Sequence, residues 1–379
     1  MKRKKICIVA TVPYALIMFM KPHIDMFASK YNVTLIANGA EKDMQTLLNE
    51  HVRFIPLNIE RNISLLKDVR ALFSLLKIFR REKFDVVHSI GPKSALLAMF
   101  SALLAGVPYR IHTFTGQVWA TRVGVSKFVL KTFDRVIALC ATGLLADSFS
   151  QRQFLVNQNI VAERKIVVLG HGSVCGVDVE RFKPNIEIRT KIRNALGIPQ
   201  NAIVFLFLGR LNSDKGIRDL AEAFSSLATQ MPNARLLVVG PDEGGMDKIL
   251  QWTLEKCRSQ FHRVGYTSRP EDYMASADIF CLPSYREGFG SVIIEAAATG
   301  VPSVASKIYG LMDAVVDGET GILHPPKDID EIKLALLQLS NDSFLRQKMA
   351  AQAKVRVQTY FTIDILTSAM REYYSKLLG

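Results

Sequence analysis

Two cations stand in a short stretch that directly follows an apolar run. Arg210 and Lys215 lie in residues 209–216, after the strand-like segment 203–208 and before a segment of helical period. A turn between a strand and a helix offers backbone N–H groups and, here, two positive charges, which together suit an anionic group such as a phosphate. The same stretch alone is equally compatible with two solvated cations on a loop.

A second stretch combines two carboxylates with glycines at the start of a predicted helix. Glu287 and Glu295 have seven residues between them, including Gly288 and Gly290. Glycines let a ligand approach the backbone, and a helix N-terminus favours a phosphate through its unpaired N–H groups. A carboxylate within an apolar helix is costly without a partner, and hydroxyls of a ribose or a sugar would supply one for Glu295. The alternative is that Glu295 lies on an exposed helix face.

The first half of the chain carries fewer candidates. His112 lies in the strand-like segment 110–114, and Lys93 follows the segment 85–91. A single histidine at a strand end is more often structural than functional. Lys93 is a candidate contact for an acceptor diphosphate.

The elements that must position these residues alternate between strand and helix. Short β-branched runs followed by longer stretches of helical period are typical of βαβ units and parallel sheets. Strands are predicted at 6–11, 33–38, 53–57, 85–91, 110–114, 135–141, 166–170, 202–209, 236–240, 278–284, 302–306 and 321–324, and helices at 216–231 and 361–378. Such sheets bind ligands at the carboxyl ends of their strands, where the candidates stand.

The length predicts more than one domain, because 379 residues exceed the size of a usual single core. The segment 170–199 lacks sustained hydrophobic alternation and is the predicted linker. We expect an α/β protein of two doubly wound domains facing a cleft: an N-terminal domain at 1–184, a C-terminal domain at 185–360, and a final helix at 361–379 packing back towards the N-terminal domain.

The net charge of +13 is concentrated in the first half. Residues 1–180 hold 24 basic and 13 acidic residues, against 24 and 22 in the remainder. Basic residues mix with leucine, valine and phenylalanine at 61–84 and 122–135, a composition that lets a helix lie on an anionic bilayer. The alternative is a packing helix with a solvated basic face. The candidate membrane or acceptor contacts are Lys93, Arg70, Lys77, Arg80, Arg81, Lys127 and Lys131.

The compartment is predicted from the cysteines and the N-terminus. The five cysteines are far apart and form no CxxC motif, which argues against disulfides and zinc and favours a reducing cytoplasm. The basic residues of 1–5 and the apolar run 6–20 imitate a secretion signal, but Pro13 interrupts the run and no small-residue cleavage site follows.

Together the motifs resemble those of the retaining glycosyltransferases of family 4, which have the GT-B fold of two Rossmann-like domains. The matching motifs are 176–184, 209–216, 239–244, 287–295 and 317–321. The resemblance covers nearly the whole chain. The segment 112–119 is similar to that of bacterial enzymes that act on lipid-linked surface-polysaccharide precursors.

The resemblance implies a role for each candidate. Arg210 and Lys215 would hold the diphosphate of a nucleotide-sugar donor, with a UDP-sugar expected. Glu295 would bind the ribose and Glu287 the transferred sugar, which His112 would approach from the first domain. The catalytic candidates are therefore His112, Arg210, Lys215 and Glu287, and the further donor contacts are Arg263 and Val264 at the base and the backbones of Gly288, Phe289, Gly290 and Ser291 at the sugar and phosphate.

The resemblance also implies transfer with retention of configuration, to a polyprenyl-diphosphate-linked glycan in lipopolysaccharide or related polysaccharide biosynthesis. Two cations and a helix N-terminus could stabilise the departing diphosphate, so we expect neither metal nor cofactor. We expect attack on the front face and a peripheral location on the inner face of the cell membrane. Residues 11–14 replace the Gly-Gly loop that many family members have after the first strand, which leaves phosphate contacts there in question.

Two other functions compete with this one. A nucleotide-sugar 2-epimerase shares the fold, but the seven-spaced glutamates and the 209–216 motif favour family 4. A non-catalytic anion-binding protein would explain the charge. No known nucleic-acid motif is present, and the basic segments mix with aliphatic more than with stacking aromatic residues, so we expect no nucleic-acid partner.

Overall fold

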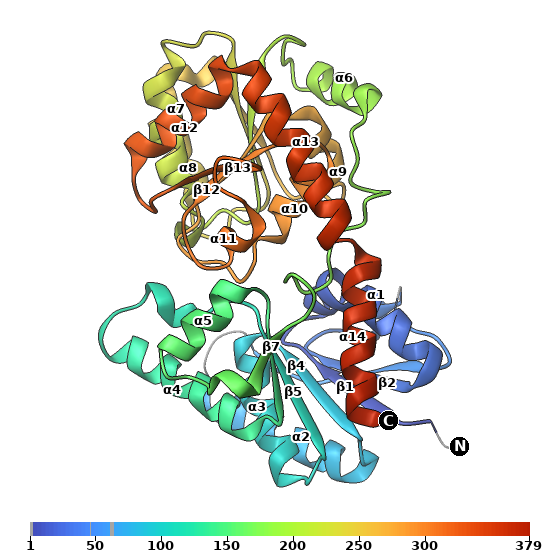
Figure 1. The fold of residues 1–379 in the computed structure, drawn as a ribbon. Coiled ribbons are helices and arrows are strands. Elements are labelled where there is room, and N and C mark those ends of the chain that lie inside the picture. Colours follow the sequence, from blue (N-terminus) through green and yellow to red (C-terminus); the bar gives the residue numbers. More distant parts are fainter. Residues whose placement is uncertain (1–2, 46, 61–63) are drawn as a thin grey trace. The chain divides into compact units, whose positions relative to one another are not determined.

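The strands form two separate parallel sheets, and helices alternate with them along the chain (Figure 1). The computed structural model describes residues 3–45, 47–60 and 64–379. The chain divides into unit 1, Met1–Cys175 with Ile363–Gly379, and unit 2, Gly176–Thr362.

The boundaries differ from the expected 184/185 and 360/361. The backbone N–H of Val177 donates to the carbonyl of Phe361 at 2.8 Å, and Val177 and Phe182 are buried in the core of unit 2. Residues 176–184 therefore belong to the second unit.

Within the described residues, unit 1 contains a seven-stranded parallel sheet in the order β3-β2-β1-β4-β5-β6-β7. Its strands are β1 (Lys5–Val9), β2 (Asn32–Ala37), β3 (Val52–Pro56), β4 (Val86–Ile90), β5 (Tyr109–Phe114), β6 (Gly143–Ala146) and β7 (Ile166–Val168). Its helices are α1 (Pro13–Lys30), α2 (Leu65–Glu82), α3 (Pro92–Leu104), α4 (Gly124–Cys140), α5 (Phe149–Asn157) and α14 (Ile363–Leu378), with 3-10 turns at Glu41–Met44, Val118–Thr121 and Glu163–Lys165.

The two faces of this sheet carry different helices. Ile6 and Ile8 of β1 face a core shared with α1 and α14, whereas Cys7 and Val9 face a core shared with α2, α3 and α4. This alternation is the period of a strand covered on both sides. The apolar run that imitates a secretion signal thus forms a central buried strand and the start of α1.

Unit 2 contains, as far as the structure describes it, a six-stranded parallel sheet in the order β10-β9-β8-β11-β12-β13. Its strands are β8 (Ile203–Leu208), β9 (Ala234–Val239), β10 (Phe261–Val264), β11 (Ile279–Leu282), β12 (Ser303–Ser306) and β13 (Gly321–His324). Its helices are α6 (Ile186–Ala195), α7 (Ile217–Ala228), α8 (Met246–Thr253), α9 (Pro270–Ser276), α10 (Ser291–Ala298), α11 (Leu311–Ala314), α12 (Ile329–Asn341) and α13 (Ser343–Tyr360), with 3-10 turns at Ser213–Lys215 and Glu255–Gln260.

One predicted strand is wrong. Residues 135–140 continue helix α4, where Ile137 is buried and Leu139 is 79% exposed, as expected of a helix with one face in the core. The strand that follows β5 is instead β6, Gly143–Ala146, whose glycine, leucines and alanine carry no β-branched signal. The short edge strand β10 was also not predicted.

The described cysteines are all buried, and none of them forms a disulfide within the described residues. Among the helices that the structure describes, none is both long and apolar enough to cross a bilayer.

Candidate functional site

The strand order of unit 2 reverses between β8 and β11. From β8 the chain proceeds outward to β9 and β10 on one side, whereas β11, β12 and β13 extend the sheet on the other. Doubly wound sheets bind their ligands at such a point, beyond the carboxyl ends of the strands. Residues 209–216 follow β8 and residues 283–290 follow β11, so the fold brings the two motifs together.

Lys215 and Glu287 meet where these two loops touch. The Lys215 Nζ lies 2.5 Å from Glu287 Oε1, which also accepts a hydrogen bond from Ser284 Oγ at 2.9 Å. Both charged side chains are mostly buried. The close approach depends on Gly216, because its φ is +63° and a Cβ there would lie 1.9 Å from the Pro283 carbonyl oxygen.

Arg210 pairs with a carboxylate that sequence reasoning missed. Its Nη1 lies 2.8 Å from Glu243 Oε2, in a pair that is partly exposed. The turn carrying Glu243 is fixed beside the Arg210 loop, since Glu243 N–H donates to Leu211 O at 3.1 Å and Leu211 N–H to Pro241 O at 2.8 Å. Each of the two candidate phosphate-binding cations therefore forms an ion pair with a carboxylate.

Helix α10 begins at Ser291, directly after this loop. Gly290 precedes it with φ of +80°, and no side chain caps its first turn. N–H groups at such a terminus are available to an anion. The Phe289 side chain is buried and contacts Phe361 at 5.2 Å between ring centroids, so at 288–291 the backbone rather than the aromatic ring is available to a ligand.

Glu295 is half-buried on α10, which excludes a fully exposed helix face. Burial raises the pKa of Glu295 to about 7, while Arg181 lowers it and Glu271 raises it. Arg181 is itself held by Glu271, with Nη2 2.8 Å from Oε2. A carboxyl that titrates near neutrality next to an anion site is typical of functional positions.

The candidate base contacts lie on β10, two strands from β8 in the sheet. Arg263 Nε donates to Asp247 Oδ1 at 2.6 Å, and the Val264 carbonyl accepts from Gly240 N–H at 3.1 Å. Both residues are half-buried and are the last two residues of the edge strand β10.

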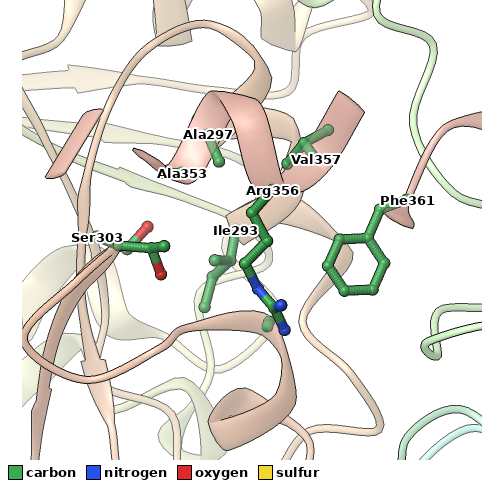
Figure 2. A pocket seen from close by; sticks show the side chains of 9 residues that line it. Ile293, Ala297, Ser303, Ala353, Arg356, Val357 and Phe361 are labelled. Atoms are coloured by element: carbon green, nitrogen blue, oxygen red, sulfur yellow. The ribbon is translucent and has the colours of Figure 1, made fainter. Parts of the chain in front are cut away.

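A small cavity elsewhere in unit 2 is separate from these residues. Figure 2 shows Arg356 of α13 at this cavity, and its Nη2 donates to the Asp313 carbonyl at 2.6 Å. The cavity is lined by Ile293, Ala297, Ser303, Ala314, Thr320, Ala353, Arg356, Val357 and Phe361. None of the candidate site residues is among them.

In unit 1, His112 lies in β5 and is buried. Its Nδ1 lies 3.1 Å from the Ser89 carbonyl oxygen and 3.0 Å from Ser89 Oγ. Because a carbonyl only accepts, Nδ1 carries the proton and Nε2 holds the lone pair of the neutral ring. Burial lowers the pKa of His112 to about 3, so the ring is neutral at physiological pH.

A second buried histidine joins the C-terminal helix to the sheet. His88 of β4 contacts the Tyr374 hydroxyl through Nδ1 and Thr113 Oγ1 through Nε2, both at 2.8 Å. Tyr374 lies on α14, which packs against α1. The partners are far apart in the sequence, and no local pattern indicates this network.

The candidate acceptor and membrane residues of unit 1 divide into two groups. Lys93 Nζ lies 2.8 Å from Asp68 Oδ1, and Lys131 Nζ donates to Gln158 Oε1 at 2.9 Å while lying 5.4 Å from the Trp119 ring centroid. These two lysines therefore face protein partners. Residues 61–63 of the first basic stretch lie outside the described residues, and the remaining candidates, exposed or half-exposed, are Arg70, Lys77, Arg80, Arg81 and Lys127.

Comparisons with known proteins agree with this arrangement. The family described as "Glycosyl transferases group 1" matches residues 188–356, and a "Glycosyl transferase 4-like domain" matches residues 26–172. The Staphylococcus aureus capsular polysaccharide biosynthesis glycosyltransferase CapM is 30% identical, over 100% of this chain and 98% of its own length. An Escherichia coli UDP-Gal:alpha-D-GlcNAc-diphosphoundecaprenol alpha-1,3-galactosyltransferase is 30% identical over 86% of this chain and 84% of its own length.

Solved structures share the fold at lower identity. Anabaena HepE in complex with UDP and glucose superposes with a TM-score of 0.82 at 18% identity, covering 99% of this chain and 100% of its own. WaaG, a glycosyltransferase involved in lipopolysaccharide biosynthesis, gives 0.75 at 17% identity and covers 99% of each chain. The expected GT-B fold and glycosyltransferase class are confirmed, and the chain belongs to the group 1 glycosyltransferases.

Proposed function

We propose that this glycosyltransferase moves a hexosyl or N-acetylhexosaminyl group from a UDP-sugar to a lipid-linked glycan during surface-polysaccharide assembly, with retention of configuration. The names of the relatives support the substrate classes: one full-length relative acts in capsule synthesis, and another uses a UDP-sugar and a diphosphoundecaprenol-linked acceptor. The nucleotide UDP is also bound by the structural neighbour HepE.

The observation that carries the proposal is the Lys215–Glu287 pair at the strand-order reversal of unit 2. One loop presents a cation suited to a phosphate, and the neighbouring loop presents a carboxylate suited to sugar hydroxyls. An anomeric carbon lies between diphosphate and sugar in the donor, so adjacent recognition of both groups suits cleavage of the bond that joins them.

Charge development in the transition state fits the same residues. As the anomeric C–O bond breaks, negative charge grows on the diphosphate, where Lys215, Arg210 and the N-terminus of α10 would stabilise it. Because these groups are fixed before the reaction begins, little reorganisation is needed. We propose that they suffice without a metal ion, which predicts activity in the presence of EDTA.

We further propose front-face attack. The acceptor hydroxyl oxygen bonds to the anomeric carbon, the bond to the donor diphosphate breaks with its electron pair, and the acceptor proton passes to a departing phosphate oxygen. The neutral His112, with its lone pair on Nε2, would accept a hydrogen bond from a donor-sugar hydroxyl. Isolation of a covalent glycosyl-enzyme would contradict this mechanism.

A peripheral membrane location is proposed from the surface of unit 1. Leu65 and Leu66 at the start of α2 are 78% and 79% exposed, and Val125 and Phe128 at the start of α4 are 79% and 67% exposed. Because each helix follows a strand and returns antiparallel to it, both starts lie towards the carboxyl edge of the sheet. Exposed apolar residues beside Arg70 and Lys127 suit insertion into an anionic lipid surface.

The donor claim is tested by thermal stabilisation with UDP-, GDP- and ADP-sugars. A ligand at about one hundred times its dissociation constant adds about 2.7 kcal/mol, so the correct nucleotide would raise the melting temperature measurably. No stabilisation by any nucleotide sugar, together with no release of nucleoside diphosphate in the presence of membrane lipid extract, would contradict the proposed function.

The membrane claim has a separate test. Sedimentation with vesicles of anionic phospholipid should retain the protein, and zwitterionic vesicles should retain less. The double variant Leu65→Ser, Leu66→Ser should lose retention while still binding nucleotide sugar. Equal retention of variant and wild type would contradict the role of this surface.

A further inference from the structure

Two residues next to Glu287 connect the loops of the donor site in a way that no motif indicates. Tyr285 and Arg286 precede Glu287 on the loop after β11, and both contact the segment that carries Lys215. The three consecutive residues 285–287 thus each bind the β8 loop or the helix that follows it.

Arg286 binds the residue adjacent to Lys215. Its Nη2 lies 2.8 Å from Asp214 Oδ2, and both side chains are mostly shielded, at 23% and 32% exposed. The backbone makes the same link, because Tyr285 N–H donates to the Asp214 carbonyl at 2.8 Å. Asp214 is therefore held through its side chain and its main chain by two neighbouring residues of the other loop.

Tyr285 extends this connection into helix α7. Its hydroxyl donates to Asp219 Oδ2 at 2.6 Å, and Asp219 lies in the first turn of α7 and is buried. Burial, with Asp219 beside it, raises the pKa of Tyr285, which keeps the hydroxyl protonated as a donor. Lys327 Nζ lies over the Tyr285 ring, 5.2 Å from its centroid.

The Lys215 loop has little local structure to fix it. It is a 3-10 turn of three residues, Ser213–Lys215, without a side-chain cap, and the left-handed Gly216 separates it from α7. A single 3-10 turn is weakly stabilised by its own hydrogen bonds. Contacts from Tyr285 and Arg286 therefore determine where the Lys215 ammonium lies relative to Glu287.

We propose that Tyr285 and Arg286 are positioning residues that fix the Lys215 loop, so that diphosphate and sugar are bound at a set separation. The proposal rests on the proposed function, since it assigns Lys215 to the donor diphosphate. It differs from a role in folding alone, because loosening this loop affects the phosphates of a ligand and leaves base and ribose contacts in place.

The test compares UDP with uridine, which has the base and ribose but no phosphate. Arg286→Ala should weaken UDP binding about tenfold and raise the KM for the UDP-sugar similarly, whereas Tyr285→Phe, which keeps the ring, should weaken it about threefold. Uridine affinity, measured by ligand-detected NMR, should stay within about twofold of wild type for both variants. Arg218→Ala is the matched control, because it removes an exposed cation of α7 whose partner is Glu222.

A charge exchange provides the second measurement. The double variant Asp214→Arg, Arg286→Asp should recover most of the UDP affinity that Asp214→Arg alone or Arg286→Asp alone loses, because it restores the ion pair with its direction reversed. The proposal would be overturned if Arg286→Ala and Tyr285→Phe lost UDP and uridine binding equally. It would also be overturned if both of these variants bound UDP as the wild type does. Absence of UDP binding by the wild-type protein would instead contradict the proposed function.

Discussion

The two sheets reverse their strand order in the same way but differ in the chemistry of the loops at that point. In unit 2 the loops after β8 and β11 carry the ion pairs of Arg210, Lys215 and Arg286. In unit 1 the reversal lies between β1 and β4, where Thr11, Val12 and Pro13 follow β1. The same reversal of strand order therefore carries loops of different chemistry in the two units, and the charged loops of unit 2 are the ones that suit an anion.

The strongest test of this contrast replaces one lysine near each reversal point by alanine. Lys215 follows the reversal strand β8, and Lys93 follows β4. Lys215→Ala should reduce kcat/KM for the UDP-sugar at least about 100-fold, because a fixed charge at the leaving group is lost. Lys93→Ala should change UDP-sugar affinity less than about twofold, because Lys93 belongs to unit 1 and is not among the proposed donor contacts.

Release of nucleoside diphosphate and calorimetric binding would give these two values. A loss of donor affinity in Lys93→Ala as large as that in Lys215→Ala would remove the distinction between the two reversal points.

The next test concerns the neutral histidine of unit 1. His112→Ala should lower kcat about tenfold with little change in UDP affinity, because the ring is assigned to the transferred sugar rather than the nucleotide. Ser89→Ala, which keeps the imidazole and removes one contact at Nδ1, is the milder comparison. A parallel fall in UDP affinity would show that the assignment to the sugar is wrong.

Glu295 should make donor binding depend on pH near neutrality. Its pKa is raised from 4.5 to about 7, so it contributes to folding stability fully below pH 4.5, and this contribution is lost as the pH rises through 7. Ribose hydroxyls donate to the ionised form, so UDP-sugar affinity should rise severalfold from pH 6 to pH 8. His112, with a pKa of about 3, should add nothing in this range.

Calorimetric titrations across this range would measure the effect, with Glu295→Gln as the control that should remove it. A wild-type profile as flat as that of Glu295→Gln would contradict the role of this carboxyl at the donor.

The smallest expected effect is at Arg210. Glu243→Gln should strengthen UDP binding about two- to threefold, because the partly exposed pair no longer competes with the ligand for the guanidinium. Glu222→Gln removes an equal charge from the Arg218 pair on α7 and should leave UDP affinity unchanged. Weaker UDP binding in Glu243→Gln would mean that Glu243 orients Arg210 instead of competing for it.

The site residues differ in how well the sequence indicated them. Lys215 and Glu287 stand beside glycines after apolar runs, and these local features predict a strand, a turn and a helix start. Asp214 and Arg286 have no such signal. Their pairing depends on β8 lying next to β11, a consequence of strand order that periodicity does not contain.

Similar reasons explain where the predicted fold differs from the observed one. Residues 135–141 were predicted as a strand because valine, isoleucine and leucine occur together, but their helix buries one face and exposes Leu139. The network of His88, Thr113 and Tyr374 joins residues brought together only by tertiary packing. Most other strands were predicted within one or two residues of their ends, since buried parallel strands are continuous apolar runs.

The return of the C-terminal helix to unit 1 has a consequence for biosynthesis. Unit 2 is one continuous insertion, and its ends lie together, because Val177 N–H bonds to Phe361 O. Residues 1–175 are synthesised before unit 2, yet the core of unit 1 lacks Tyr374 until helix α14 has been synthesised. The inserted unit can therefore complete its folding first, whereas residues 1–175 complete their core only after helix α14 has been synthesised.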